Sequence, residues 1–115
     1  MKSQTEKIRE LAFQYFEAWN NHDLDKLGEI ISDDVTLIDW EISVSGSIEF
    51  LRANRDIFQK NPGIKAKLTK SFVDGNDFIA ILDISSQSSD EVHRVVDHIS
   101  FKNNKIASIM AYRGF

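Results

Sequence analysis

Three side chains that can hold or exchange a proton stand where the surrounding pattern calls for apolar residues. Tyr15 falls in the apolar stripe of an expected helix, Asp97 lies on a strand face with Val95 and Ile99, and Asp39 ends another strand. Burying a phenol and two carboxyls costs free energy unless they have partners or a task. Two carboxyls in unequal surroundings can divide into a base and a neutral acid. Proton transfer is therefore the first hypothesis.

Asp97 has two interpretations. Desolvation raises the pKa of a carboxyl on an apolar strand face, and a protonated Asp can donate a hydrogen bond to an oxygen that gains negative charge. Alternatively, Asp97 is a structural carboxylate paired with Tyr15, Arg94 or Arg113. The sequence leaves both open.

Tyr15 and Asp39 also have structural alternatives. A tyrosine in a helical stripe is commonly a core residue whose hydroxyl bonds some acceptor, and aspartate at a strand end is commonly a turn residue. As a base, Asp39 would have to face inward, within hydrogen-bond reach of a carbon acid. Its phase with Val35 and Leu37 permits this, although it also brings Glu41 to the same side.

Helical periodicity marks the N-terminal half. A first helix begins at the capping box of Ser3 and Glu6, ends at residues 20–21, and has its apolar residues at three- and four-residue spacing. A short second helix starts at Asp23 and is broken by residues 32–34. A third runs from Gly46 to about Lys60, and its candidate core contacts are Ile48, Leu51, Ile57 and Phe58.

The remaining segments read as strands. One strand is expected at 35–42, between the second and third helices, and four more at 64–73, 78–86, 91–101 and 106–112, with a polar loop at 85–90. Helices segregated from a meander indicate an α+β fold. We expect one domain, residues 1–115, in which a cone-shaped, curved antiparallel or mixed sheet wraps around three helices and encloses an interior pocket.

Composition excludes several function classes. The net charge of −4 and the scattered basic residues argue against a nucleic-acid surface. The absence of cysteine excludes disulfides and thiolate catalysis. No apolar stretch approaches the roughly 20 residues that span a bilayer, and the polar N-terminus lacks a signal core. We expect a cytoplasmic protein without a membrane partner.

Neither a metal nor a cofactor is expected. His93 and His98 are five residues apart on one strand and so point to opposite faces, while His22 falls in a loop between helices. The chain contains no glycine-rich phosphate loop or nucleotide fingerprint.

A small hydrophobic carbonyl compound is the expected ligand, because the remaining pocket walls would be apolar. The candidate substrate-binding residues are Trp19, Trp40, His93 and Phe101, where His93 is placed at the pocket mouth or, alternatively, in structural packing.

The sheet also carries apolar residues on both faces. Ile79, Ile81, Ile109 and Ala111 are assigned to one phase, and Leu82 and Met110 to the other. This exceeds what a sheet with one wet face needs, so a homodimer through the sheet is predicted.

Three segments together resemble a known family. YFEAWNNHDLD at 15–25, SDDVTLID at 32–39 and VVDHISF at 95–101 are similar to the nuclear transport factor 2-like superfamily, which includes the SnoaL-like proteins. Within it, the likeness is greatest to the steroid Δ5-3-ketosteroid isomerases. That resemblance implies that Asp39 shuttles a proton while Tyr15 and a protonated Asp97 hold the substrate oxygen, in an allylic isomerisation without a cofactor.

Two departures from the isomerase pattern lie beside the expected base. Trp40 stands where the isomerases have proline, and the connection from Asp39 to Gly46 is shorter. Both changes alter the pocket, so the chemistry transfers more readily than the steroid. A SnoaL-like cyclase or dehydratase and a non-catalytic ligand-binding or assembly module are the alternatives on this fold.

Overall fold

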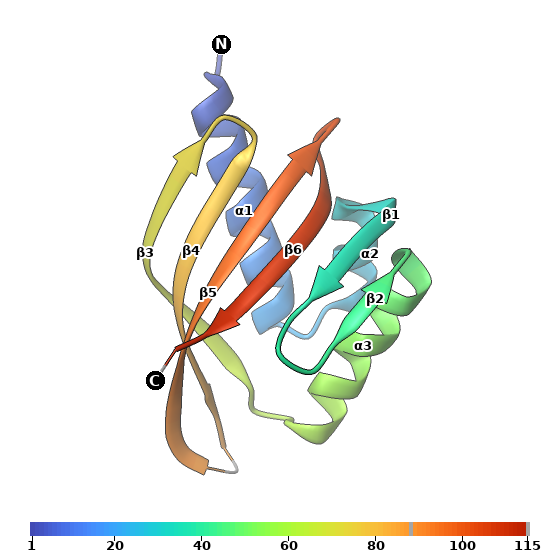
Figure 1. The fold of residues 1–115 in the computed structure, drawn as a ribbon, viewed down its shortest axis with the longest axis vertical. Coiled ribbons are helices and arrows are strands. Elements are labelled where there is room, and N and C mark those ends of the chain that lie inside the picture. Colours follow the sequence, from blue (N-terminus) through green and yellow to red (C-terminus); the bar gives the residue numbers. More distant parts are fainter. Residues whose placement is uncertain (88, 115) are drawn as a thin grey trace.

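The computed structural model describes residues 1–87 and 89–114. Three helices pack against one face of a curved, six-stranded sheet that does not close (Figure 1). This α+β architecture confirms the predicted fold class. The elements are α1 (Gln4–Asn20), α2 (Leu24–Ile30), β1 (Ile31–Ile38), β2 (Ser43–Ser45), α3 (Ser47–Lys60), β3 (Lys65–Asp74), β4 (Asp77–Ser86), β5 (Ser89–Lys102) and β6 (Lys105–Arg113).

The helix starts follow the predicted capping signals. The Ser3 hydroxyl accepts a hydrogen bond from the Glu6 amide at 3.2 Å, and the Asp23 carboxylate accepts one from the Lys26 amide at 3.0 Å. Each bond satisfies one of the free amides of a first helical turn. Gly46 precedes α3 with a φ of 91°, a left-handed conformation that glycine adopts without a Cβ clash.

In the strand order β2-β1-β6-β5-β4-β3, the early strand β1 lies between β2 and the C-terminal strand β6. β1 runs parallel to β6, whereas the other neighbours are antiparallel. Ile38 pairs with Met110, and Met110 pairs with His98 of β5. The end of β1 therefore lies level with the part of β5 that carries Asp97, with β6 between the two strands.

The structure corrects the limits of the early strand. β1 begins at Ile31 rather than at residue 35, and the register irregularity between Ile31 and Thr36 accommodates the polar residues 32–34 that were predicted to separate helix from strand. β1 also ends at Ile38, before the expected 42. The Asp39 amide donates to the Ile42 carbonyl at 2.8 Å, so the chain turns there and returns as β2.

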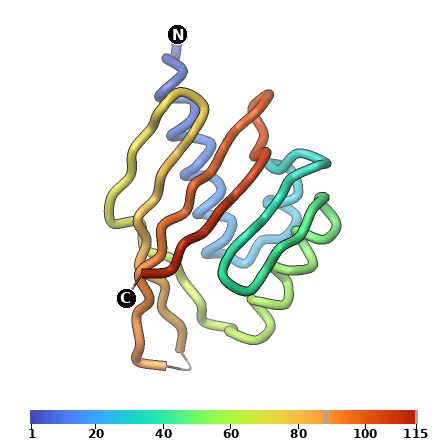
Figure 2. The backbone as a smooth tube through the Cα atoms, viewed as in Figure 1, coloured from blue at the N-terminus to red at the C-terminus, as the bar shows by residue number. Residues whose placement is uncertain are grey.

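The polar segment 85–90 is mostly strand rather than loop, although residue 88 lies outside the described residues. β4 continues to Ser86 and β5 starts at Ser89, because the two strands go on pairing with each other beyond the end of β6. β6 pairs with β5 only from Val95 onward. The start of β5 therefore projects past the end of β6 (Figure 2).

The predicted core of α3 was wrong in part. Its buried residues are Phe50, Asn54 and Phe58, at four-residue spacing, whereas Ile48 is 72% exposed.

None of the helices in the described part of the chain has the length and apolar character that a membrane span requires. The cytoplasmic location stays a prediction.

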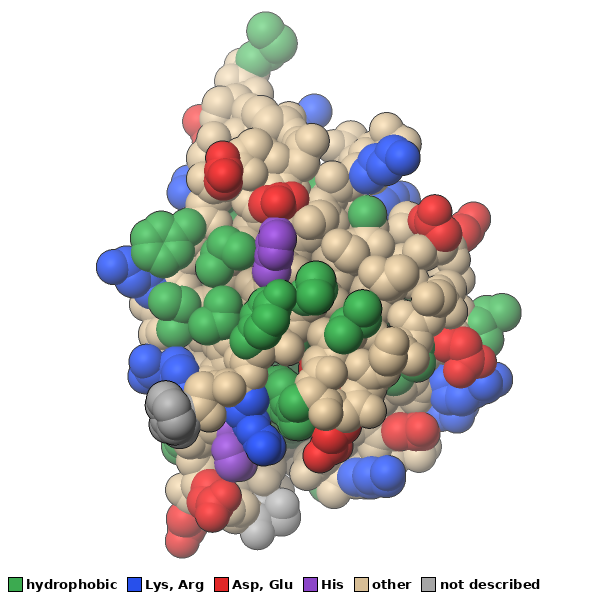
Figure 3. Space-filling model, in the orientation of Figure 1, with side chains coloured by type: hydrophobic (Ala, Val, Ile, Leu, Met, Phe, Trp, Pro, Cys, Tyr) green, Lys and Arg blue, Asp and Glu red, His purple; other side chains and the backbone are tan. Residues whose placement is uncertain are grey.

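The outward face of the sheet carries a row of large side chains. Phe72, Ile79, His98, Met110 and Ile38 are successive cross-strand neighbours from β3 to β1. Hydrophobic side chains gather on this face around a histidine (Figure 3).

Two residues that were predicted to share a face with Ile79 and Ile81 lie on the inward face instead. Ile109 is buried in the core and Ala111 lines an interior pocket, because β6 alternates in the opposite phase. Met110 and Tyr112 are the exposed residues of that strand.

The homodimer through this face stays a prediction, and Met110→Glu tests it. We expect the wild-type protein to sediment as a dimer at micromolar concentration and the variant as a monomer, because an interface would bury the new carboxylate without a partner. Ile48→Glu, at an exposed apolar position on α3, is the matched control and should remain a dimer. A wild-type protein that is only monomeric would contradict the prediction.

Candidate active site

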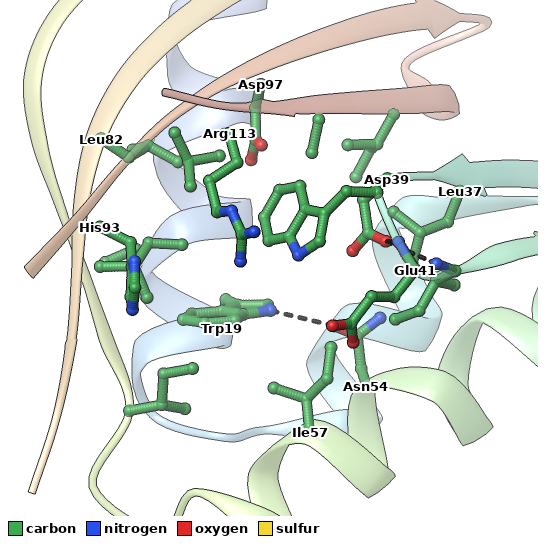
Figure 4. Close-up of a pocket in the computed structure, with 18 of the residues that line it drawn as sticks. Trp19, Leu37, Asp39, Glu41, Asn54, Ile57, Leu82, His93, Asp97 and Arg113 are labelled. Atoms are coloured by element: carbon green, nitrogen blue, oxygen red, sulfur yellow. Dashed lines mark hydrogen bonds between the residues drawn. The ribbon is translucent and has the colours of Figure 1, made fainter. Parts of the chain in front are cut away.

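A pocket of about 240 Å³ opens between the concave face of the sheet, α1, α3 and the turn after β1. Most of its wall is apolar, and the polar side chains that reach it come from five different elements or turns (Figure 4). Those side chains belong to Tyr15, Trp19, Asp39, Trp40, Glu41, Asn54, His93, Asp97 and Arg113.

Asp97 lies on the inward face of β5 and is only 8% exposed. Its cross-strand neighbours, Ala80 and Ala111, are too small to fill the space in front of the carboxyl. Within the described residues the carboxyl forms no hydrogen bond or ion pair. Burial, and secondarily the charge of Asp39, together raise the pKa of Asp97 from its ordinary value of 3.8 to about 7.

The structural alternative for Asp97 is not what the structure shows. Arg94 bonds Asp83 at 2.6 Å instead, and neither Tyr15 nor Arg113 is paired with Asp97 in the described chain. A buried carboxyl without a cationic partner has its lowest free energy in the neutral form, and that form can donate a hydrogen bond.

Tyr15 approaches the same pocket from α1. It is 4% exposed, and its ring packs edge-on against Phe16 with the centroids 5.1 Å apart. Burial and, secondarily, the charge of Asp97 raise the pKa of Tyr15 well above its usual value, so the phenol stays protonated. Its hydroxyl has no hydrogen-bond partner among residues 1–87 and 89–114, and it is free to donate to a guest.

Asp39 is both a turn residue and a pocket residue. One carboxylate oxygen, Oδ1, accepts the amides of Glu41 at 2.7 Å and Ile42 at 2.6 Å. These bonds fix the orientation of the carboxylate, and the side chain lines the half-buried edge of the pocket. Its second oxygen, Oδ2, accepts no hydrogen bond in the described residues and can take a proton.

Three of the four predicted substrate-binding residues line this pocket. Trp19, Trp40 and His93 reach it, and His93 lies exposed near its mouth. Phe101 does not: it is buried in the core, four residues and about 13 Å along β5 from Asp97. The shared strand face was recognised correctly, but the site occupies only part of that face.

Residues 12–109 match the SnoaL-like domain family over most of the chain. The chain belongs to this family. No curated protein matches the sequence significantly.

Solved structures share the fold of this SnoaL-like domain at low identity. An NTF2-like protein of unknown function from Cytophaga hutchinsonii is 20% identical, with a TM-score of 0.80 over 99% of this chain and 95% of its own. A putative ketosteroid isomerase from Kribbella flavida is 19% identical, with a TM-score of 0.85 over 98% and 82%. A putative polyketide cyclase from Sinorhizobium meliloti is 20% identical, with a TM-score of 0.82 over 89% and 93%. A special closeness to the isomerases stays a prediction.

Asn54 and Arg113 also line the pocket, but neither was predicted as a pocket residue, and Arg113 was considered only as a partner of Asp97. Asn54 is 2% exposed and accepts the indole N–H of Trp19 at 2.9 Å, while its amide donates to the Phe50 carbonyl at 3.0 Å. It therefore fixes the Trp19 wall of the SnoaL-like pocket. The sequence pattern that indicates a buried Asn54 is its position midway between Phe50 and Phe58, at four-residue spacing on one face of α3.

Among the described residues, no group of three histidine, aspartate or glutamate side chains is arranged to hold a metal ion. His93 lies 3.5 Å from Glu91, and His98 lies 3.0 Å from Asp77 on the outward face. His93 and His98 thus have different carboxylate neighbours and lie on opposite faces of β5.

Asp97→Asn tests the burial of this carboxyl through stability. Between pH 3.8 and about 7 the native state keeps a proton on Asp97 that the unfolded chain releases, so the contribution of this group to wild-type stability falls as pH rises through that window and does not change above it. Asparagine has no such proton. We expect the variant's stability relative to wild type to rise between pH 4 and pH 8, by at most about 4 kcal/mol.

The free energies of unfolding come from urea titrations of both proteins at the two pH values. Asp83→Asn removes an aspartate outside the pocket and is the control. A difference between Asp97→Asn and wild type that does not change with pH would show that Asp97 titrates normally.

Proposed function

We propose that this SnoaL-like domain is an enzyme that moves a proton within a small hydrophobic carbonyl compound, in an allylic isomerisation without a cofactor. The observation that supports this most is that Tyr15 and Asp97, neither of which has a hydrogen-bond partner in the described chain, line one pocket with the carboxylate of Asp39. Two neutral donors and one oriented base are what enolate chemistry requires.

In the proposed reaction, Asp39 takes a proton from the carbon between a ketone and a carbon–carbon double bond. The electrons of that C–H bond form a dienolate, whose oxygen accepts hydrogen bonds from Tyr15 and protonated Asp97. Asp39 then returns the proton to the far carbon of the double bond, which moves into conjugation with the ketone. The atoms and electrons balance without a further reactant.

Pocket size favours a small ligand. The volume of about 240 Å³ lies below the roughly 300–1,000 Å³ of sites that enclose drug-sized molecules. Trp40 beside the base also narrows the site relative to the isomerase pattern. The proposal therefore commits to proton transfer and not to a steroid.

The same enolate supports a second candidate. If a ligand held a second carbonyl within reach, the enolate carbon would attack it and close a ring, as the name of the Sinorhizobium meliloti neighbour suggests for that protein. A ring-closed product in a substrate screen would favour this reaction. The open cavity beside a buried carboxyl without an ion pair weighs against the non-catalytic ligand-binding or assembly module.

Variants of the three groups test the proposal with cyclohex-3-enone, whose conversion to the conjugated ketone is followed by ultraviolet absorbance. Asp39→Asn removes the base and should slow the reaction about 100- to 10,000-fold. Tyr15→Phe removes one donor and should slow it about 100- to 1,000-fold. Asp83→Asn, outside the pocket, should match wild type.

Deuterium exchange at the carbon next to the ketone, followed by NMR, provides a second readout that does not need the double bond to move. Equal exchange by wild type and Asp39→Asn would remove Asp39 from the role of base. A wild-type rate no faster than buffer for several unsaturated ketones would contradict the proposed activity.

The pH profile separates the acid from the base. Since Asp97 must be protonated to donate, kcat/KM should fall about tenfold per pH unit above about pH 7. Asp97→Asn donates at every pH and should be slower but without this alkaline fall. The same fall in the asparagine variant would show that another group titrates.

A further inference from the structure

Arg113 has no role in the proposed proton transfer, yet its side chain reaches the same pocket. It pairs with Val95 across β5 and β6, and Ala111, two residues earlier, pairs with Asp97. Arg113 and Asp97 are therefore diagonal neighbours on the inward face, with backbones about 7–8 Å apart. Figure 4 shows both side chains directed into the cavity.

The guanidinium of Arg113 has no anionic partner. Its carbon lies 5.2 Å from the centre of the Trp40 ring, and it forms no salt bridge within the described residues. By contrast, Arg52 and Arg94 each bond a carboxylate, of Glu49 and Asp83 respectively. Stacking on an aromatic face leaves the N–H edge of a guanidinium available, and that edge matches a carboxylate.

Besides Asp97, two acidic residues share the pocket with Arg113, but neither forms an ion pair with it in the described chain. The Oδ1 atom of Asp39 is occupied by the amides of residues 41 and 42, and Glu41 has an exposed side chain that bonds no cation. The turn geometry therefore aims Asp39 at the cavity while Arg113 remains unpaired at its edge.

We propose that the ligand carries a carboxylate, which binds Arg113 while the ligand's carbonyl oxygen lies between Tyr15 and Asp97. For the carbonyl end, this inference rests on the proposed function. The substrate class is then a short oxo acid with a double bond next to the carbon that loses the proton. Ala111, between the two polar positions, has no side chain beyond Cβ and leaves room for the connecting carbon chain.

This arrangement also assigns a purpose to Trp40, which replaces the proline of the isomerase pattern. The indole holds the guanidinium at the mouth, and the carboxylate clamp fixes which ligand carbon lies next to Asp39. Orienting a substrate through a remote charged group contributes to rate by keeping the reacting carbon within reach of the base.

Calorimetric titration with 5-oxohexanoate and with its methyl ester tests the clamp without requiring turnover. Wild type should bind the carboxylate about tenfold or more tightly than the ester, as expected for a charge-assisted hydrogen bond. Arg113→Met should abolish this preference, and Arg113→Lys should keep part of it. Arg94→Met, whose arginine is paired with Asp83, should keep all of it.

Equal binding of the two ligands by wild type, or a preference that survives in Arg113→Met, would overturn the clamp. Neither result bears on proton transfer, which the cyclohexenone assay tests with a neutral ketone. Conversely, loss of the cyclohexenone reaction with an intact carboxylate preference would remove the proposed isomerisation and leave Arg113 as a carboxylate-binding residue.

Discussion

The desolvated carboxyl of Asp97 is the feature on which the site depends. An ionised carboxylate this deeply buried and without a cationic partner would cost several kcal/mol, whereas its neutral form costs much less. The fold maintains this state by flanking Asp97 with Ala80 and Ala111 on the neighbouring strands. These small neighbours leave open space in front of the carboxyl and form no ion pair with it, so the neutral carboxyl can donate a hydrogen bond to a ligand.

The parallel pairing of β1 with β6 completes the site. It carries Asp39 and Trp40 from the N-terminal half to the end of β6, where Arg113 lies. The turn after β1 then orients Asp39 through two amide hydrogen bonds. The pocket thus combines a base held by backbone amides, two neutral donors from α1 and β5, and a cation without an ionic partner among the described residues.

Local patterns were sufficient to find Tyr15 and Asp97, because each interrupts an apolar stripe whose period fixes its direction. They also identified the helices and the α+β class. They did not place Arg113 in the pocket, because its position beside Trp40 depends on the β1–β6 pairing of segments far apart in the chain. They also missed β2, which pairs with β1 across a short turn but has only three residues in which to show a strand pattern. Phe101 shows a related limit: strand alternation predicts which face a side chain lies on, but not whether its position along the strand is next to the pocket.

The most direct measurement is an NMR titration of the Asp97 carboxyl carbon in the protein without ligand. We expect a midpoint near pH 7 in the wild-type protein and a lower midpoint in Asp39→Asn. The variant lacks the neighbouring negative charge that helps Asp97 to keep its proton. A midpoint near 4, as in an exposed aspartate, would contradict it.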